Sequence, residues 1–235
     1  MKKLFCLVLA ALLTLGACAL AEGVMSYADF AAAEIDDEVT IETYVQAHQG
    51  WWEDNGAGKV TLYCQSEDGA YFLYNASATQ EEAEKLVPGT KIVATGYKAE
   101  WSGEVEIVDA TFEVVEGEYI AEPIDVTDQL GTDALIESQN KKVAFKGMTV
   151  EPIGEGAAFL YGWDGSGEEG SDLYFNVSIN GATYSFTVES YLCGPGSEVY
   201  EAVKALNVGD VVDLEGFLYW YEGPNPHITA VTAAQ

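Results

Sequence analysis

The stretch LVPGTKIVATGYKAEWSG, residues 86–103, has a counterpart in LNVGDVVDLEGFLYWYEG, residues 206–223. The two stretches share a leucine, a branched aliphatic residue and three glycines at a constant offset of 120 residues. The matched pairs are Leu86 and Leu206, Gly89 and Gly209, Ile92 and Val212, Gly96 and Gly216, and Gly103 and Gly223. Repetition of one spacing indicates two copies of a single structural unit.

The segments that precede this pair repeat as well, and their offset changes only where loops are expected. Residues 39–45 alternate apolar and polar side chains, as in a half-buried strand, and residues 143–149 follow them at an offset of 104. Asp68-Gly69 and Asn180-Gly181 each separate two strand-like runs at an offset of 112. These dipeptides predict tight hairpins whose two central residues take positive φ.

Short helices are predicted after each hairpin and before each barrel. Thr79 with Glu82 forms a capping box, and Ser197 is the expected cap of the second helix. Ser26 and Thr132 precede helical patterns that lead into the two copies. Each copy therefore consists of three strands, a helix and two further strands.

This order resembles the OB-fold, and the Leu-x-x-Gly-x-x-Ile/Val-x-x-x-Gly run after each helix is similar to the start of the fourth strand in many OB-folds. The chain as a whole resembles tandem OB-like proteins exported by bacteria. The resemblance implies an all-β fold with short helices, made of two tandem five-stranded OB-like barrels; other small barrels of five or six strands are the alternative. The predicted parts are a signal peptide (1–21), a first OB-like barrel with an N-terminal helix (22–117), a linker (118–126) and a second OB-like barrel (127–235).

The N-terminus has the pattern of a secretory signal, because Lys2 and Lys3 precede the apolar residues 4–15. We therefore expect an exported protein that is extracellular or associated with the cell envelope. Ala19-Leu20-Ala21 fits cleavage by signal peptidase. Cys18 also ends a lipobox-like sequence and is the candidate lipidation site, so a lipid anchor is the alternative to free release.

Charge is the strongest feature of the composition: 39 acidic residues face 10 basic ones, a net charge of −29. Cleavage after residue 21 would remove two lysines and no acid, which leaves about −31. Such a surface repels phosphate backbones and anionic lipids, so nucleic acid is not expected as a partner. A solvated exterior is the simplest interpretation, and an exported cation-responsive protein is a further alternative.

Aromatic residues gather in the loops that frame the ligand face of an OB-fold, between strands 1 and 2 and between strands 4 and 5. The candidate ligand-binding residues are Trp51, Trp52, Trp101, Trp163, Tyr219, Trp220 and Tyr221. Aromatic faces beside polar groups suit sugar rings, which predicts a non-enzymatic extracytoplasmic binding module for a saccharide or another neutral ligand. The alternative is that these rings pack between the domains of a structural or protein-interaction pair, with a carbohydrate or an envelope protein as the respective partner.

Few other residues suggest chemistry. Asp164, Glu168 and Asp172 alternate like the start of a calcium loop, but Phe175 stands where an EF-hand needs its bidentate acid, so a flexible loop is favoured over a Ca²⁺ site. No catalytic motif is present, so neither an enzyme nor a bound cofactor is expected. Cys64 and Cys193 are interpreted as two separate thiols, with a single bridge as the alternative. His227 is interpreted as an ordinary strand-end residue.

Overall fold

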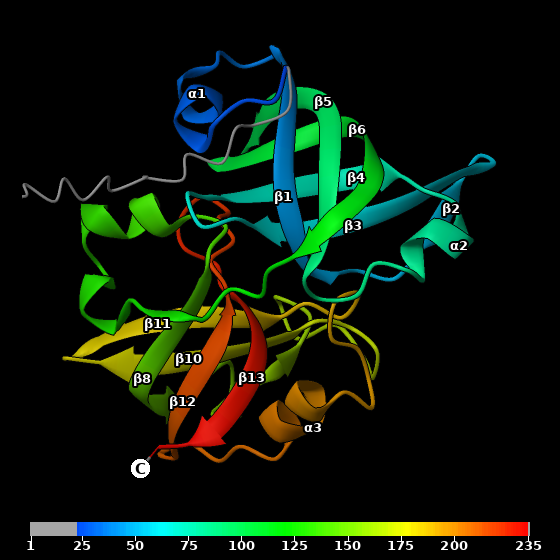
Figure 1. The fold of residues 1–235 in the computed structure, drawn as a ribbon. Coiled ribbons are helices and arrows are strands. Elements are labelled where there is room, and N and C mark those ends of the chain that lie inside the picture. Colours follow the sequence, from blue (N-terminus) through cyan, green and yellow to red (C-terminus); the bar gives the residue numbers. More distant parts are fainter. Residues whose placement is uncertain (1–22, 235) are drawn as a thin grey trace, which may run out of the picture.

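The computed structural model describes residues 23–234, which form two β-barrels in succession along the chain (Figure 1). The first barrel lies at the top of the view and the second at the bottom, and each has its own apolar core. The predicted fold class is confirmed: the chain is all-β with short helices, in two tandem OB-like barrels. The predicted signal peptide and Cys18 lie outside the described residues.

The first barrel closes into a ring of five strands. Its elements are α1 (Tyr27–Ala32), β1 (Glu38–His48), β2 (Trp52–Asp54), β3 (Ala57–Gln65), β4 (Ala70–Ser77), α2 (Gln80–Ala83), β5 (Thr90–Trp101) and β6 (Glu104–Glu118). Around the ring β1 pairs with β3, β3 with β4, β4 with β6, β6 with β5 and β5 with β1. Only the β4–β6 pair is parallel, and the short β2 extends the sheet beyond β3. This is the strand order of an OB-fold.

The second barrel repeats this ring. Its elements are β7 (Ile124–Asp125), η1 (Thr127–Gln129), η2 (Asp133–Ser138), β8 (Lys142–Glu151), β9 (Leu160–Tyr161), β10 (Leu173–Ile179), β11 (Ala182–Val188), α3 (Glu198–Lys204), β12 (Val211–Phe217) and β13 (His227–Ala233). β8, β10, β11, β13 and β12 close the ring, again with one parallel pair, β11–β13. β7 and β9 are short additions at its edges.

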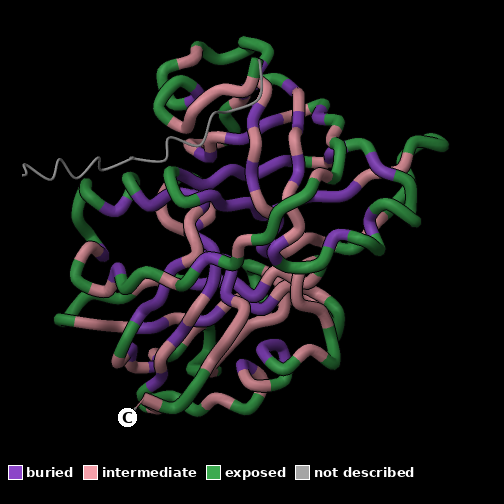
Figure 2. The backbone as a smooth tube through the Cα atoms, in the orientation of Figure 1, coloured by how far each residue is buried: buried purple, intermediate pink, exposed green. Residues whose placement is uncertain are grey.

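Alternation along the strands fills both cores, and Figure 2 shows the buried segments concentrated in the strands of each barrel. On β1 the side chains of Val39, Ile41 and Val45 are fully buried, as the alternation predicts. The equivalent strand β8 buries Val143 and Phe145 in the second core. Each barrel thus has an independent apolar interior.

The helix ends largely follow the sequence signals. Ser26 caps α1, Ser197 caps α3, and Thr79 and Glu82 form the complete capping box of α2. Thr132 precedes a 3₁₀-helix rather than an α-helix. The ammonium of Lys98 is buried and donates to three carbonyl oxygens at the end of α1, at distances of 2.7–3.0 Å, where a cation complements the helix dipole.

The two predicted hairpin turns differ. Asn180 and Gly181 have φ of 53° and 81°, which confirms the turn predicted there. At Asp68-Gly69 the predicted hairpin between β3 and β4 forms, but the predicted turn conformation is wrong, because neither residue has positive φ. Gly69 instead lies against the ring of Tyr27, which a Cβ would overlap, while the Asp68 carboxylate accepts from the Tyr27 N–H at 3.1 Å. This turn is shaped by packing against α1.

The predicted linker is fastened to both barrels. The N–H of Ala121 donates to the Gln46 side chain of the first barrel at 2.8 Å. Ile124–Asp125 then forms β7, which pairs in parallel with β8 of the second barrel. Between the barrels Tyr63 and Phe72 pack with Phe217 in a separate buried cluster. The two barrels are therefore joined by packed side chains as well as by the chain.

Candidate functional site: an aromatic pocket between the barrels

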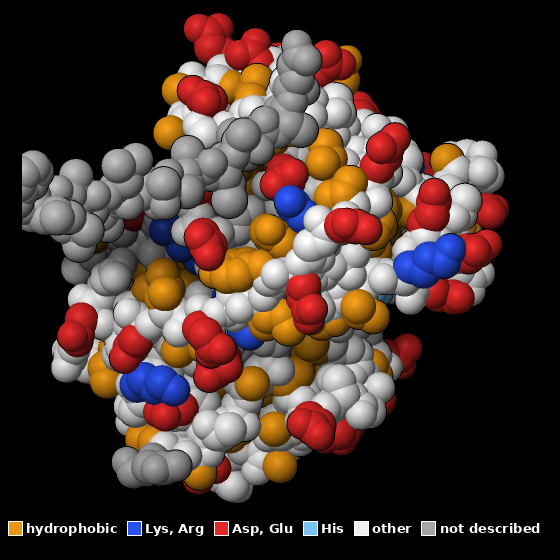
Figure 3. Space-filling view, in the orientation of Figure 1, with side chains coloured by type: hydrophobic (Ala, Val, Ile, Leu, Met, Phe, Trp, Pro, Cys, Tyr) orange, Lys and Arg blue, Asp and Glu red, His pale blue; other side chains and the backbone are white. Residues whose placement is uncertain are grey.

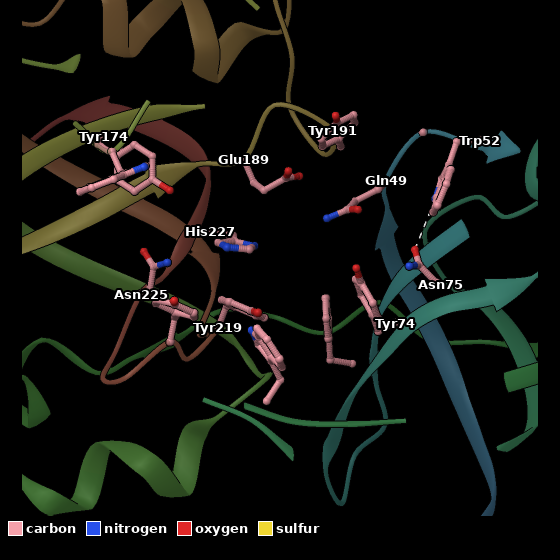
Figure 4. Close-up of a pocket in the computed structure, with 15 residues that line it drawn as sticks. Gln49, Trp52, Tyr74, Asn75, Tyr174, Glu189, Tyr191, Tyr219, Asn225 and His227 are labelled. Carbon is pink, nitrogen blue, oxygen red and sulfur yellow. Dashed lines mark hydrogen bonds between the residues drawn. The ribbon is translucent and has the colours of Figure 1, made fainter. Parts of the chain in front are cut away.

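A cavity of about 950 Å³ lies between the two barrels, and both contribute its walls (Figure 4). The first barrel supplies Gln49, Gly50, Trp52, Phe72, Tyr74, Asn75 and Trp101. The second supplies Trp163, Tyr174, Glu189, Tyr191, Tyr219, Tyr221, Asn225 and His227. Most of these side chains are aromatic, and the volume is that of a small-molecule site.

On the first barrel, strand β4 and two loops position the wall. Tyr74 lies on β4, and Trp101 is the last residue of β5 at the tip of its hairpin with β6. The indole N–H of Trp52 donates to the Asn75 side-chain oxygen at 3.3 Å, which links β2 to β4 (Figure 4). Asn75 takes φ of 52°, a left-handed conformation that an asparagine tolerates.

On the second barrel the wall comes mainly from three loops. Trp163 belongs to the loop between β9 and β10 and is 78% exposed, and Tyr191 belongs to the loop between β11 and α3 and is 75% exposed. Tyr219 and Tyr221 belong to the loop between β12 and β13. With Trp101 and Tyr221, which are also exposed and line the same pocket, Trp163 and Tyr191 form an exposed aromatic patch, and contiguous patches of this kind mark interaction sites.

The floor of the pocket contains a buried hydrogen-bonded chain. His227, the first residue of β13, is 6% exposed and stacks on Tyr219 with ring centroids 4.3 Å apart. Its Nδ1 lies 2.7 Å from the Tyr63 hydroxyl of the first barrel. The Gln49 side chain donates to the same hydroxyl at 3.4 Å. Burial lowers the pKa of His227 to about 3, so the ring is neutral at physiological pH.

Glu189 supplies the carboxylate of the pocket. One of its oxygens accepts from the Leu192 N–H at 2.8 Å, which orients the side chain. Burial, with a contribution from Asp172, raises the pKa of Glu189 to about 7. Among the described residues, no lysine or arginine lines the pocket. Figure 3 shows acidic side chains spread over the visible face of the molecule with few basic ones between them, in keeping with the net charge of −29.

Five of the seven predicted binding residues line this pocket: Trp52, Trp101, Trp163, Tyr219 and Tyr221. The other two do not. The indole N–H of Trp51 donates to the Ala78 carbonyl at 2.9 Å, and its ring packs against the first core. Trp220 packs against the second core, where its ring lies beside Gly103 of the first barrel. The sequence alone could not separate the rings that face this cavity from those that face a core, and the binding role of all seven stays a prediction.

Several pocket residues lie outside the regions that the sequence indicated. Tyr74 and Asn75 lie on a strand, and Glu189 and Tyr191 lie in the loop before α3, whereas the OB-fold pattern points only to the loops between strands 1 and 2 and between strands 4 and 5. His227 begins a strand, as expected, but it also lines the cavity. Of these residues only Tyr191 could have been found from the sequence, because it is an aromatic residue in a loop that also carries the acidic Glu189.

The candidate calcium ligands do not come together. Asp164 accepts from the Ser166 N–H within its own loop, and Asp172 accepts from both the N–H and the hydroxyl of Ser190. In the described part of the chain, no group of three or more His, Cys, Asp or Glu residues could hold a metal ion, so Asp164, Glu168 and Asp172 do not form the cluster that the disfavoured alternative, a Ca²⁺ site, would need. Cys64 and Cys193 are both free thiols, which excludes the alternative of a bridge.

Comparison with known proteins gives no family and no curated relative, because no family model and no curated sequence matches. Solved structures do match. A murine DNA-binding protein bound to double-stranded DNA has a TM-score of 0.40 and 13% identity, covering 83% of this chain and 96% of its own. The tetrameric p202 HIN2 has a TM-score of 0.35 and 11% identity, covering 86% of this chain and 96% of its own. A replication protein A heterotrimer bound to single-stranded DNA has a TM-score of 0.38 and 11% identity, covering 92% of this chain and 52% of its own. The likeness concerns the fold.

These neighbours correct the predicted function. They are described with double-stranded or single-stranded DNA, not with a saccharide or another neutral ligand, which contradicts the prediction of a saccharide-binding module. They also contradict the partner prediction, a carbohydrate or envelope protein with nucleic acid excluded. That exclusion rested on the net charge of the whole chain, which does not determine what one local surface binds. The predicted export signal lies outside the described residues and stays a prediction. Within residues 23–234, no helix is long and apolar enough to cross a membrane.

Proposed function

We propose that the protein is a non-enzymatic receptor for an organic cation, such as a substituted ammonium group, held in the aromatic pocket between the barrels. The observation that carries this proposal is the composition of the lining: aromatic rings with one carboxylate, Glu189, and no lysine or arginine among the described residues. The face of an aromatic ring is negative and attracts cations, and cages of such rings bind quaternary ammonium groups.

Electrostatics favours a cation over an anion or a neutral ligand at this site. The whole chain carries a net charge of −29, which attracts cations over the range that salt permits. Glu189 has a pKa of about 7, so the empty pocket accepts a proton in place of a counter-ion. A bound cation would displace that proton and restore the carboxylate.

Single-stranded nucleic acid is a second candidate, and the same lining favours it. Trp52, Trp101 and Trp163 offer flat faces at the rim of an open pocket, and aromatic faces stack on bases regardless of sequence. A phosphate backbone would be repelled by a chain of net charge −29, so binding is expected to be weak at low ionic strength, where this repulsion is least screened. The cation is therefore the first candidate.

The test compares choline with 3,3-dimethylbutan-1-ol, which has the same shape but a carbon in place of the charged nitrogen. Calorimetry and tryptophan fluorescence should show saturable choline binding that is at least about tenfold tighter than that of the neutral alcohol. Glu189→Gln should weaken choline binding, whereas Glu155→Gln, the same substitution at an exposed position outside the pocket, should not. Equal affinities for the two compounds refute the proposal. Saturable binding of oligodeoxythymidine without choline binding favours the second candidate.

The place of action is a separate matter. Lys2, Lys3 and the apolar residues 4–15 support export, with Cys18 as the site of an alternative lipid anchor. Mass spectrometry of the mature N-terminus tests both: an unprocessed Met1 would refute export, and a diacylglyceryl-modified Cys18 would establish the anchor.

A further inference from the structure

A buried histidine on the pocket floor suggests that the ligand has a hydrogen-bonding group as well as a charge. His227 is 6% exposed, lines the pocket, and lies with Glu189 and Gln49 around the same central space (Figure 4). A neutral imidazole carries one N–H donor and one acceptor nitrogen. Which nitrogen carries the proton decides what the histidine offers to a ligand.

The hydrogen bonds around Tyr63 determine the tautomer. The Gln49 amide donates to the Tyr63 hydroxyl at 3.4 Å, so this oxygen acts as acceptor on one side. The hydroxyl proton needs an acceptor of its own, because a buried donor left unpaired is costly. His227 Nδ1, at 2.7 Å, is in position to accept it. The imidazole proton is then on Nε2, and Nε2 is the nitrogen not engaged by Tyr63.

Burial holds this arrangement. The His227 ring stacks on Tyr219 and meets Tyr63 edge to face at 5.9 Å, so it is held from both barrels. The pKa of His227 lies near 3, which keeps the ring from becoming a cation in competition with the ligand. His227 and Glu189 line the same pocket, so the imidazole N–H donor and the carboxylate face one ligand space (Figure 4).

We infer that the ligand carries a hydrogen-bond acceptor beside its cationic group, that the Nε2–H of His227 binds this acceptor, and that Tyr63 is the positioning residue for that donor. The inference rests on the proposed function, since it assigns chemistry to the same pocket. An ester or amide carbonyl joined by a short linker to a substituted ammonium is the ligand class that fits. Glu189 and the rings bind the charge, and His227 selects for the carbonyl.

The test uses two ligands of one shape: acetylcholine, which has an ester carbonyl, and pentyltrimethylammonium, which has the same chain length and charge without it. Removing His227 alone would leave the Tyr63 hydroxyl buried without an acceptor, so the variant is Tyr63→Phe with His227→Phe. Replacing both partners by apolar groups of similar shape is nearly neutral for stability. The expected result is a loss of about five- to tenfold in acetylcholine affinity and no change for pentyltrimethylammonium.

A second measurement needs no mutation. The ¹⁵N chemical shifts of the His227 ring in the wild-type protein should report a neutral imidazole with its proton on Nε2. A proton on Nδ1 overturns the inference, as does an equal change in affinity for the two ligands in the double variant. If the wild-type protein binds neither ligand, the proposed function itself fails, which distinguishes that failure from a failure of the inference.

Discussion

Glu104 predicts a loss of stability at alkaline pH that can be worked out from its surroundings. It is the first residue of β6, is fully buried between the barrels, and accepts from the Trp220 N–H at 2.8 Å and from the Gln139 amide at 3.4 Å through one oxygen. Its other oxygen is buried without a hydrogen-bond partner among the described residues. Burial raises the pKa of Glu104 to about 8 from an ordinary value of 4.5, so the folded protein holds it as a neutral acid at pH 7.

The sign of the effect follows from this raised pKa. Below pH 4.5 both the folded and unfolded states bind the proton, and the stabilisation is complete. As the pH rises the unfolded state releases the proton first, and the stabilisation falls until the pH passes about 8. Each pH unit over which the two states differ by one bound proton changes the free energy of unfolding by about 1.4 kcal/mol. The protein therefore loses about 4 kcal/mol between about pH 5 and pH 9 through this group.

Glu104→Gln removes the ionisation and keeps the shape and the acceptor for Trp220. Urea unfolding at intervals from about pH 5 to pH 9 should therefore give a flatter profile for the variant, with the gap from wild type widening by about 4 kcal/mol across the range. Glu106→Gln is the matched control, because the pKa of Glu106 is raised only to about 7, also by burial, and its contribution should level off about one pH unit earlier. Profiles for Glu104→Gln and wild type that stay parallel across this range would refute the reasoning.

Three further results are expected. Choline affinity should rise by up to about tenfold from about pH 6 to pH 8, because a bound cation favours the ionised form of Glu189, whose pKa is about 7. Calorimetry of Glu189→Gln should show no such rise. Gly69→Ala should cost about 1–3 kcal/mol in urea unfolding because the new Cβ overlaps Tyr27, and Gly50→Ala, with no atom within 4 Å, should be close to neutral; equal costs would contradict this account. Thr79→Ala should lower the free energy of unfolding by about 1 kcal/mol through loss of the capping box of α2, and an unchanged denaturation midpoint would show that the cap is irrelevant.

The repeat was enough to predict both barrels, because strand alternation and helix caps are local signals that occur in both copies and agree with the tertiary fold. Alternation at Val39 and Ile41, and the caps at Thr79 and Ser197, produce the same local structure in either copy. Gly69 is a position where prediction from the sequence fails. Its dipeptide favours a two-residue turn, but packing against α1 decides the conformation, and a contact with so distant a part of the chain has no local signature.

The pocket was predictable only in part for a related reason. Aromatic residues in loops can be counted from the sequence, but Trp51 and Trp52 are neighbours and only Trp52 faces the cavity. The Trp51 indole is held in the first core by the Ala78 carbonyl, a contact that loop composition does not reveal. The hydrogen bond between Tyr63 and His227 joins residues 164 positions apart. No periodicity within one copy could have indicated it.

Duplication and divergence make different contributions to this site. Trp101 and Tyr221 are separated by the same 120 residues that relate the glycines of the two copies, and both line the cavity, so the ring-bearing rim comes from one loop used twice. The carboxylate of the pocket, unlike the aromatic rim, is not repeated in the two copies. Residue 77, which precedes Glu189 by the hairpin offset of 112, is Ser77, and the first barrel contributes no carboxylate to the lining among the described residues. The pocket therefore needs both barrels for its walls, while its carboxylate comes from the second barrel alone. A Glu189→Gln variant should retain the cavity and show a weaker preference for a cation, because the aromatic faces remain.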